Sequence, residues 1–365
     1  MSRAYSERDL YGHALCSRAD TDKKEKEDTK AELPADRKTF EVTLPNSIVV
    51  YLWELKFYRK CRNLVVLRDP WQVCRYINAT HAEFIGAPSE QGSASVCLIG
   101  LRTSTEAAQT LQSSLLTMGV GLVRVQQYDR AWSDVPQSQL LEVFRFAISC
   151  GLCSQQAFVH VGGSSGLELC DMRGLTERSA EGRITVPGCR IVCDDIEFRT
   201  LGNVVTGALT FRFTPVCYKI WRATKDLHEG SQVFVLPKMT SAKLKSHRAT
   251  LPSKTPLSQP VDLQQFWGTQ HNYHLPLENF DDLITVGFNQ LTLTYPRCVV
   301  WARKWTLQPT LSKQQGSAIV KWLARRITQV RVFSANLSFA MSLPRVTSRK
   351  RVITDGFNEP KARKL

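Results

Sequence analysis

Cys150 and Cys153 form a C-x-x-C pattern, the spacing that zinc sites and redox disulfides share. A redox pair needs the N-terminal end of a helix, where the helix dipole lowers the thiol pKa. Here the pair follows a predicted helix over 136–149, so it lies at the opposite pole. The nearest second pair, Cys189 and Cys193, falls on a predicted strand, where four residues span about 13 Å. That separation is too long for one metal ion, although the sequence leaves a metal or redox role for Cys150 and Cys153 open.

Two other patterns resemble catalytic motifs without matching them. His271 and His274 form H-x-x-H without the glutamate of H-E-x-x-H, and they precede Leu275-Pro276, so surface histidines in a loop are predicted. The glycine-rich segment 161–166 lacks the lysine that a P-loop requires, and it predicts a hairpin. We therefore expect a protein that is not an enzyme and that binds no cofactor or metal.

The charge of the chain is strongly uneven. The sequence has 48 Lys and Arg against 33 Asp and Glu, a net charge of +15, and most of the excess lies in 301–365. A local positive field of this kind attracts nucleic acid, acidic protein segments or anionic lipid. No apolar run is long enough to cross a membrane or to act as a secretory signal, so we expect an intracellular protein with reduced cysteines and no membrane partner.

Cations alternate with aromatic residues around Trp301 and Trp305, as in grooves that bind single-stranded nucleic acid. Tryptophans buried in a strand are an alternative explanation of the same sequence pattern. A predicted helix over 312–329 carries cations beside an apolar stripe, which fits either a binding surface or the solvated side of a core-facing helix. The predicted surface for nucleic acid or an acidic partner consists of Arg297, Arg303, Lys304, Lys321 and Arg325.

Two further basic clusters lie in the polar segment after Pro344. Such a pair resembles a bipartite nuclear import signal, and a solubilising tail is the alternative. The residues of the predicted signal are Arg349, Lys350, Arg351, Lys361, Arg363 and Lys364. If they act as a signal, the protein is nuclear rather than cytoplasmic.

The elements that would position these residues follow from apolar periodicity. Alternation predicts a strand over 47–57, and further strands are expected at 94–101 and 120–126. A helix over 104–118, ended by Gly119, would join the last two strands into a β-α-β unit with parallel neighbours. The predicted fold class is α+β or mixed α/β, a two-lobed globular body with a mixed sheet and covering helices.

Composition divides the chain into five segments. A Pro-, Ser- and Lys-rich stretch resembles a linker between two folded bodies, and both ends of the chain are too polar to fold. The predicted segments are a disordered charged leader (1–38), an N-terminal α/β lobe (39–237), the linker (238–259), a C-terminal α/β module (260–343) and a disordered basic tail (344–365).

Short phrases over about 233–341 resemble a known family. They are Val235-Leu236-Pro237-Lys238-Met239, Phe266-Trp267, Tyr273-His274-Leu275-Pro276, Thr294-Tyr295-Pro296 and Trp322-Leu323, in that order. They resemble an uncharacterised vertebrate family named after chromosome 18 open reading frame 63, whose shared part is domain of unknown function 4708. Members of that family continue into a long polar extension where this chain stops. The resemblance implies kinship and supplies no catalytic residue, because the family has no assigned activity.

These observations favour a non-enzymatic intracellular interaction or scaffold protein with an unidentified protein partner. The alternative is a nucleic-acid-binding protein that uses the basic C-terminal module and tail. An enzyme of unknown type is a third reading, which no motif supports.

Overall fold

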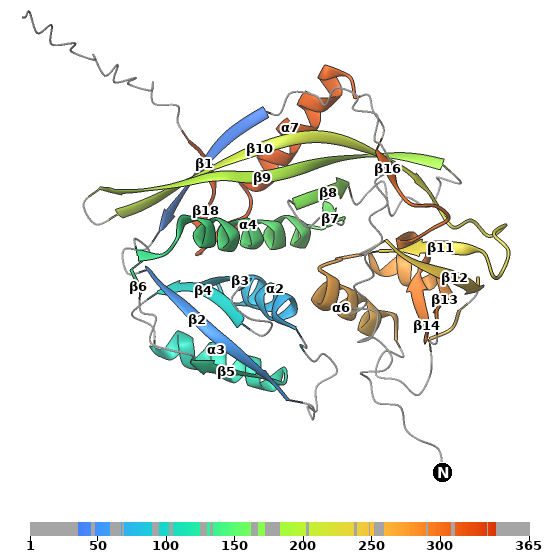
Figure 1. The fold of residues 1–365 in the computed structure, drawn as a ribbon, viewed down its shortest axis with the longest axis horizontal. Helices are drawn as coiled ribbons and strands as arrows, with labels where there is room; N and C mark the ends of the chain where they lie inside the picture. Colours follow the sequence, from blue (N-terminus) through green and yellow to red (C-terminus); the bar gives the residue numbers. More distant parts are fainter. Residues whose placement is uncertain are drawn as a thin grey trace, which may run out of the picture.

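A computed structural model describes most of the chain between residues 36 and 340. The described residues are 36–44, 48–58, 67, 69–89, 95–101, 105–124, 130–131, 134–161, 167–171, 183–201, 204–236, 239–247, 249–251, 259–289, 291–307, 311–333 and 335–340. Helices and antiparallel sheets form an α+β fold there, which confirms the predicted fold class (Figure 1). No helix among these residues is long and apolar enough to span a membrane.

The largest sheet is built around a long antiparallel hairpin of β9 and β10. Its strand order is β19-β1-β10-β9-β8-β7, and β16 also pairs with β10. The strands are β1 (Asp36–Leu44), β7 (Phe158–His160), β8 (Leu167–Asp171), β9 (Arg183–Leu201), β10 (Val204–Trp221), β16 (Thr306–Leu307) and β19 (Ser338–Phe339). The sequence predicts two short strands at 183–186 and 189–193, whereas pairing with β10 continues through Pro187 and Gly188 and makes one strand.

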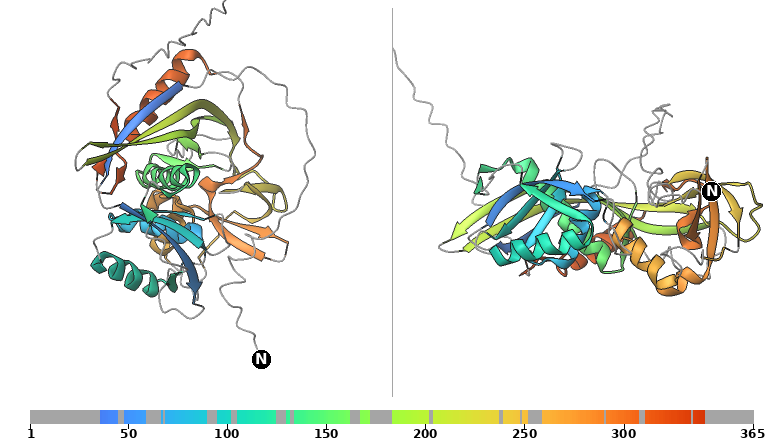
Figure 2. Two further views of the ribbon diagram at one scale, coloured as in Figure 1. Left: turned by 60° about the vertical axis from the view of Figure 1, so that its left-hand side comes forward. Right: turned by 90° about the horizontal axis from the view of Figure 1, so that it is seen from below.

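The two ends of this hairpin, which we call the long ribbon, serve different hydrophobic cores. Leu209 and Phe211 of β10 are buried in the first core, whereas Tyr218 and Ile220 are buried in the second. Odd and even positions of a strand point to opposite faces, so the ribbon turns one face to each core. Figures 1 and 2 show it running along most of the molecule, from α4 to the C-terminal sheet.

A second sheet has the order β3-β4-β2-β5, with β6 also on β2. Its elements are β2 (Ile48–Phe57), α2 (Pro70–Thr80), β3 (Phe84–Pro88), β4 (Ser95–Leu101), α3 (Thr105–Thr117), β5 (Val120–Arg124) and β6 (Arg130–Ala131). The predicted β-α-β unit exists, but β2 lies between β4 and β5 and is antiparallel to both. β4 and β5 are therefore parallel without being neighbours.

The C-terminal sheet has the order β14-β13-β12-β11-β15 and packs on α6. Its elements are β11 (Gln232–Val235), β12 (Thr240–Ser246), α6 (Pro260–His271), η3 (Leu277–Asp281), β13 (Leu283–Phe288), β14 (Leu291–Pro296), η4 (Arg297–Val299) and β15 (Val300–Trp301). The expected linker 238–259 contains β12, which lies in the middle of this sheet. The expected boundary at 237 falls inside the β11–β12 hairpin, because Ala242 and Leu244 alternate inward and fill the second core.

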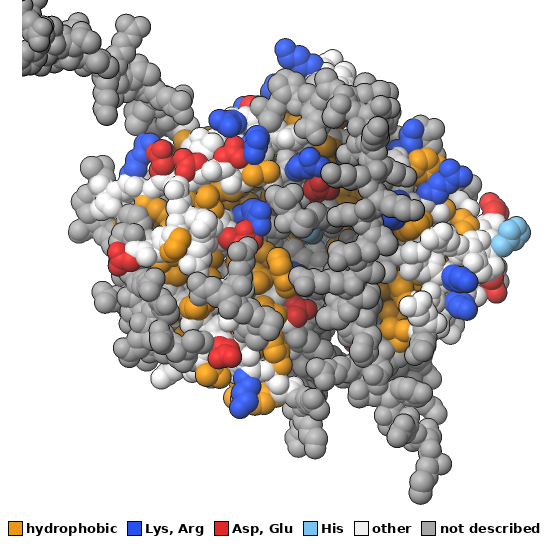
Figure 3. Space-filling model, in the orientation of Figure 1, with side chains coloured by type: hydrophobic (Ala, Val, Ile, Leu, Met, Phe, Trp, Pro, Cys, Tyr) orange, Lys and Arg blue, Asp and Glu red, His pale blue; other side chains and the backbone are white. Residues whose placement is uncertain are grey.

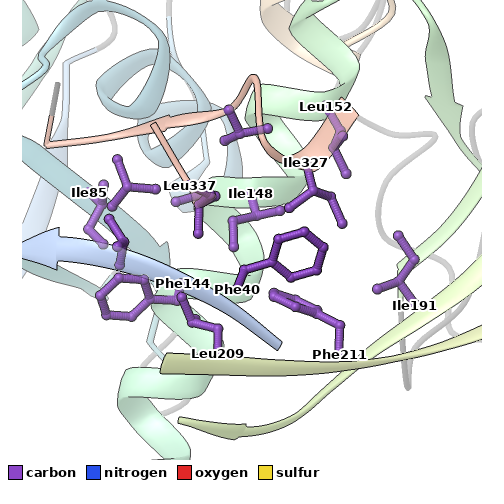
Figure 4. Close-up of a cluster of buried hydrophobic side chains, with 14 of the residues drawn as sticks. Phe40, Ile85, Phe144, Ile148, Leu152, Ile191, Leu209, Phe211, Ile327 and Leu337 are labelled. Carbon is purple, nitrogen blue, oxygen red and sulfur yellow. The ribbon is translucent and has the colours of Figure 1, made fainter. Parts of the chain in front are cut away.

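Two helices cover the first core on the inner side of the largest sheet. α4 (Gln137–Ser154) and α7 (Lys313–Ile327) contribute Phe144, Ile148 and Ile327, which meet Phe40 of β1 and Phe211 of β10 (Figure 4). The sequence assigns α7 to a separate C-terminal module, whereas its apolar stripe packs with the N-terminal elements. β17 (Arg331–Val332) and β18 (Ala335–Asn336) then form a small hairpin.

Helix α4 is longer than predicted. Gly151, expected to end the helix near residue 149, lies inside its last turn. A side chain at this position would clash with Val330, since a Cβ atom there would lie 2.6 Å from Val330 Cγ1. The glycine therefore permits close packing and does not end the helix.

We predict that Phe211→Ala lowers the free energy of unfolding by about 3–5 kcal/mol, because a buried aromatic ring is replaced by a cavity. The ring is 1% exposed and packs edge-on against Phe40 at 5.8 Å between centroids. Urea unfolding followed by circular dichroism measures the change. Val204→Ala, at a position on the same strand that is 46% exposed, is the control and should change stability by less than about 0.5 kcal/mol. Equal effects of the two variants would contradict this description of the core.

Candidate nucleic-acid interface

Strand pairing sets which side chains of the C-terminal sheet point outward. Gln232 pairs with Lys243, Lys243 with Gly287, and Gly287 with Thr292, so these four residues share one face. Their strand neighbours point the other way, and Val233, Leu244 and Val286 are buried in the second core. Lys243 is exposed, so the outer face carries a cation in the middle of the sheet.

Lys245 joins the same face through a β-bulge. The register between β12 and β13 shifts between Leu244 and Ser246, which leaves Lys245 as the extra residue. Its side chain lies over Gly287, where a Cβ atom would lie 2.7 Å from Lys245 Cε. Gly287 therefore makes room for the aliphatic part of Lys245, and a larger residue there would displace the lysine.

Arg303 and Lys304, two consecutive exposed residues between β15 and β16, each lie over an aromatic ring. The guanidinium carbon of Arg303 is 5.6 Å from the centroid of Trp221, and the ammonium of Lys304 is 5.9 Å from the centroid of Phe234. Such contacts stabilise an exposed cation by about 0.5–1 kcal/mol each. Both rings are half-buried, so each keeps part of its surface in solvent.

We call these six residues the basic patch: Trp221, Phe234, Lys243, Lys245, Arg303 and Lys304. None of its four cations forms an ion pair with another described residue. The outward positions of the described sheet strands, residues 232, 234, 241, 243, 285, 287, 292 and 294, include no Asp or Glu. Figure 3 shows Lys and Arg side chains at the right-hand end of the molecule, with Asp, Glu and His side chains beside them. The positive charge of the patch is thus available to an anionic ligand.

The two tryptophans of the motif supply no fully exposed ring, although Trp301 pairs with Phe234 and therefore shares its face of the sheet. Trp301 is 0% exposed, and Trp305 is half-buried with ring centroids 5.3 Å from Trp301 and 5.4 Å from Tyr218. The sequence left open whether these tryptophans bind a ligand or are buried in the core, and Trp301 is buried in the core. The rings that accompany the exposed cations are instead Trp221 and Phe234.

Arg297 does not belong to the surface on which the sequence analysis placed it. Its side chain is 14% exposed, and its Nε donates to both carboxylate oxygens of Asp282 at 2.9 and 2.8 Å. Its terminal nitrogens donate to the carbonyls of Ala223 at 3.1 Å and of His247 at 3.0 Å. Arg297 therefore ties η4 to two neighbouring segments and has a structural role.

Lys321 and Arg325 lie on the exposed side of α7, one turn apart, while Val320, Leu323 and Ile327 fill the first core. α7 packs on β9 and β10, so these two cations are on a different element from the basic patch. The predicted import signal, Arg349, Lys350, Arg351, Lys361, Arg363 and Lys364, lies outside the described residues.

The sequence analysis missed Trp221, Phe234, Lys243 and Lys245. The two lysines fall in the stretch interpreted as a linker, although Ala242 and Leu244 alternate with them in the pattern of a half-buried strand. Trp221 and Phe234 are more than sixty residues from Arg303 and Lys304 in sequence, so only the fold shows that they are neighbours.

The C-x-x-C pair has no feature of a reactive site. Cys150 and Cys153 lie in the last turn of α4, the pole expected from the sequence, and both are buried. Burial raises the pKa of each thiol from 9.0 to about 12. In the described part of the chain, no group of three or more His, Cys, Asp or Glu residues could hold a metal ion.

The H-x-x-H segment and the glycine-rich segment 161–166 also lack the features of a catalytic site. His271 is the last residue of α6 and packs on Trp267 at 4.9 Å, so it is not in a loop. His274 lies in the predicted loop, between α6 and η3, but both histidines are half-buried and not surface residues as predicted. β7 and β8 pair as antiparallel strands, which confirms the predicted hairpin; residues 162–166 between them are not described. Those residues also match G-x-S-x-G, but a nucleophile elbow requires a helix after the turn and β8 follows here.

Comparisons with known proteins give no assignment. No family model and no curated protein matches the sequence. Solved structures with some likeness are Argonautes. The one from Clostridium butyricum, bound to a guide DNA and a 19-mer target DNA, has a TM-score of 0.34 and 12% identity over 85% of this chain and 44% of its own. The one from Marinitoga piezophila, in complex with guide RNA and target DNA, has a TM-score of 0.28 and 8% identity over 81% of this chain and 35% of its own. This chain thus spans less than half of those proteins, and scores this low carry no conclusion about its function.

We predict that Cys150 and Cys153 react very slowly with a thiol reagent in the folded protein. The thiolate is the reactive form, and a pKa of about 12 in place of 9.0 lowers its fraction at about pH 8 by about 1,000-fold. Iodoacetamide labelling followed by peptide mass spectrometry measures the rate, with the protein in urea as the control. Labelling as fast in buffer as in urea would show that the pair is accessible.

We also predict that Arg297→Ala lowers the free energy of unfolding by about 1–3 kcal/mol, because two carbonyls and Asp282 lose their donor. Arg303→Ala, which removes an exposed arginine from the neighbouring loop, should change stability by less than about 1 kcal/mol. Chemical unfolding of both variants tests this contrast. A larger loss for Arg303→Ala would contradict the structural role given to Arg297.

Proposed function

We propose that the protein is a non-enzymatic binding protein and that its ligand at the basic patch is nucleic acid. The observation that carries the proposal is the position of two consecutive exposed cations, Arg303 and Lys304, which lie over the rings of Trp221 and Phe234 at 5.6 and 5.9 Å from the ring centroids. Cations neutralise phosphates, and aromatic rings beside them contact bases, which is the combination found in nucleic-acid-binding grooves.

The charge distribution of the described surface supports this choice. Several basic side chains elsewhere on the body are paired, for example Arg190 with Glu168 at 2.9 Å and Arg212 with Asp194 at 3.0 Å. At the basic patch no cation is paired with an acidic residue of the described part of the chain, and the cations repel one another. A polyanion relieves this repulsion and releases its own counterions, so binding there is favourable at low salt.

An acidic protein partner is the second candidate, and α7 favours it. Lys321 and Arg325 are exposed at i and i+4, where like charges repel, and α7 contains no acidic residue. An acidic segment laid along this helix would neutralise both charges. This candidate corresponds to the interaction or scaffold role that the sequence favours.

Two further parts of the proposal come from the sequence. Nuclear localisation depends on the basic clusters after Pro344, which would bring the protein to nucleic acid. Kinship with the family named after chromosome 18 open reading frame 63 would extend the same function to its members.

We predict that the double variant Arg303→Ala/Lys304→Ala binds oligonucleotides at least about 10-fold more weakly at about 0.1 M salt. The slope of log K against log salt should also fall in magnitude by about 1.4–1.8, since each phosphate contact contributes about 0.7–0.9. Fluorescence anisotropy with labelled DNA and RNA measures both quantities.

The matched control is Lys56→Ala/Arg199→Ala, which removes the same charge from exposed positions on β2 and β9. It should change the affinity by less than about 2-fold, because neither residue belongs to the basic patch. If the wild-type protein binds no oligonucleotide at low salt, or the control loses as much affinity as the test variant, the proposal is wrong.

A further inference from the structure

We propose that the basic patch binds a single strand with one base stacked on the Arg303 guanidinium, and that its lysines hold the backbone. This inference rests on the proposed function and adds the form of nucleic acid and a separate role for each cation. The two consecutive cations of the patch, Arg303 and Lys304, differ in chemistry. The guanidinium is planar and can stack on both faces, whereas an ammonium is a compact point charge.

The guanidinium carbon of Arg303 lies over the ring of Trp221, 5.6 Å from its centroid, and the residue as a whole is exposed, so the ring does not enclose the guanidinium. Contact with the ring limits the orientations of the guanidinium, so part of the entropy cost of ordering it is already met before a ligand arrives. A nucleobase can stack on the free face, and such stacking accepts any base because every base has a π-face. Arg303 is therefore a platform for a base.

The three lysines of the basic patch are arranged to follow a backbone. Lys304 lies over Phe234, and Phe234 pairs with Ser241, two residues before Lys243. Phe234 and Lys243 are thus diagonal neighbours on adjacent strands, about 7–8 Å apart. Lys245 continues the same row along β12, over Gly287. A strand whose base rests on Arg303 can thus pass Lys304 and reach Lys243 and Lys245 along one face.

A duplex cannot use the platform. Its bases are stacked on one another and expose only edges and phosphates, so it gains from the lysines and not from Arg303. A single strand gains from both. The patch should therefore prefer single strands, and the preference should depend on the shape of residue 303 as well as on its charge.

The test uses three probes with the full-length protein at about 0.1 M salt: a single strand of about 12 nucleotides, the same strand in a duplex, and a single strand of equal charge whose central nucleotides are abasic. We expect the intact single strand to bind at least about 5-fold more tightly than either of the others. Arg303→Lys keeps the charge and removes the plane, so it should lose that advantage and bind the abasic strand as the wild type does. Lys304→Arg is the control and should keep the preference.

Equal affinity of the wild type for the intact and abasic strands would overturn this inference while leaving nucleic-acid binding intact. So would equal affinity for duplex and single strand, or an Arg303→Lys variant that still distinguishes the probes. Failure of all three probes to bind at low salt would instead overturn the proposed function. Both variants should fold as the wild type does, because residues 303 and 304 are exposed, and thermal unfolding measures whether they do.

Discussion

The pairing of β9 with β10 is the interaction on which the rest of the structure depends. It continues from Val204 opposite Leu201 to Trp221 opposite Arg183, interrupted by one irregularity between Thr210 and Phe211. Since alternate residues point to opposite faces, one ribbon supplies a wall to both large cores. A change that shifted this register by one residue would turn apolar side chains outward in both cores at once.

The same ribbon positions the basic patch. The end of β10 lies beside β15. The backbone N–H of Ala302, just after β15, donates to the carbonyl of Trp221 at 2.7 Å, and Arg222 forms an antiparallel bridge with Trp301. This pairing sets Arg303 beside the ring of Trp221. Tyr273 adds a second connection, since its hydroxyl donates to the carbonyl of His160 on β7. The C-terminal sheet is therefore held against the ribbon by buried contacts, which gives exposed cations a rigid support.

Burial separates two kinds of arginine among the described residues. Arg75 and Arg297 satisfy carbonyls inside the structure: Arg75 donates to the Gln270 carbonyl in the last turn of α6, and Arg297 to those of Ala223 and His247. Burial lowers the pKa of Arg75, as expected for a cation removed from water. Arg303 and Arg325 remain in solvent. A cluster of basic letters in the sequence cannot distinguish these groups, because burial depends on what packs against each residue.

Local periodicity by itself determined the strand at 47–57, the helices near 104–118, 136–149 and 312–329, the hairpin around 161–166 and the α+β class, because these depend on neighbours along the chain. It also placed Cys150 and Cys153 at the C-terminal pole of a helix and Arg303 and Lys304 in an exposed cationic segment. Only the tertiary structure decided that 183–201 is one strand, that Thr240–Ser246 lies in the middle of a sheet, that α7 joins the first core, and that Arg297 is structural. Each of these depends on strand pairing, packing or hydrogen bonds between segments that are separated in sequence. A local sequence pattern does not specify which other segment it will contact.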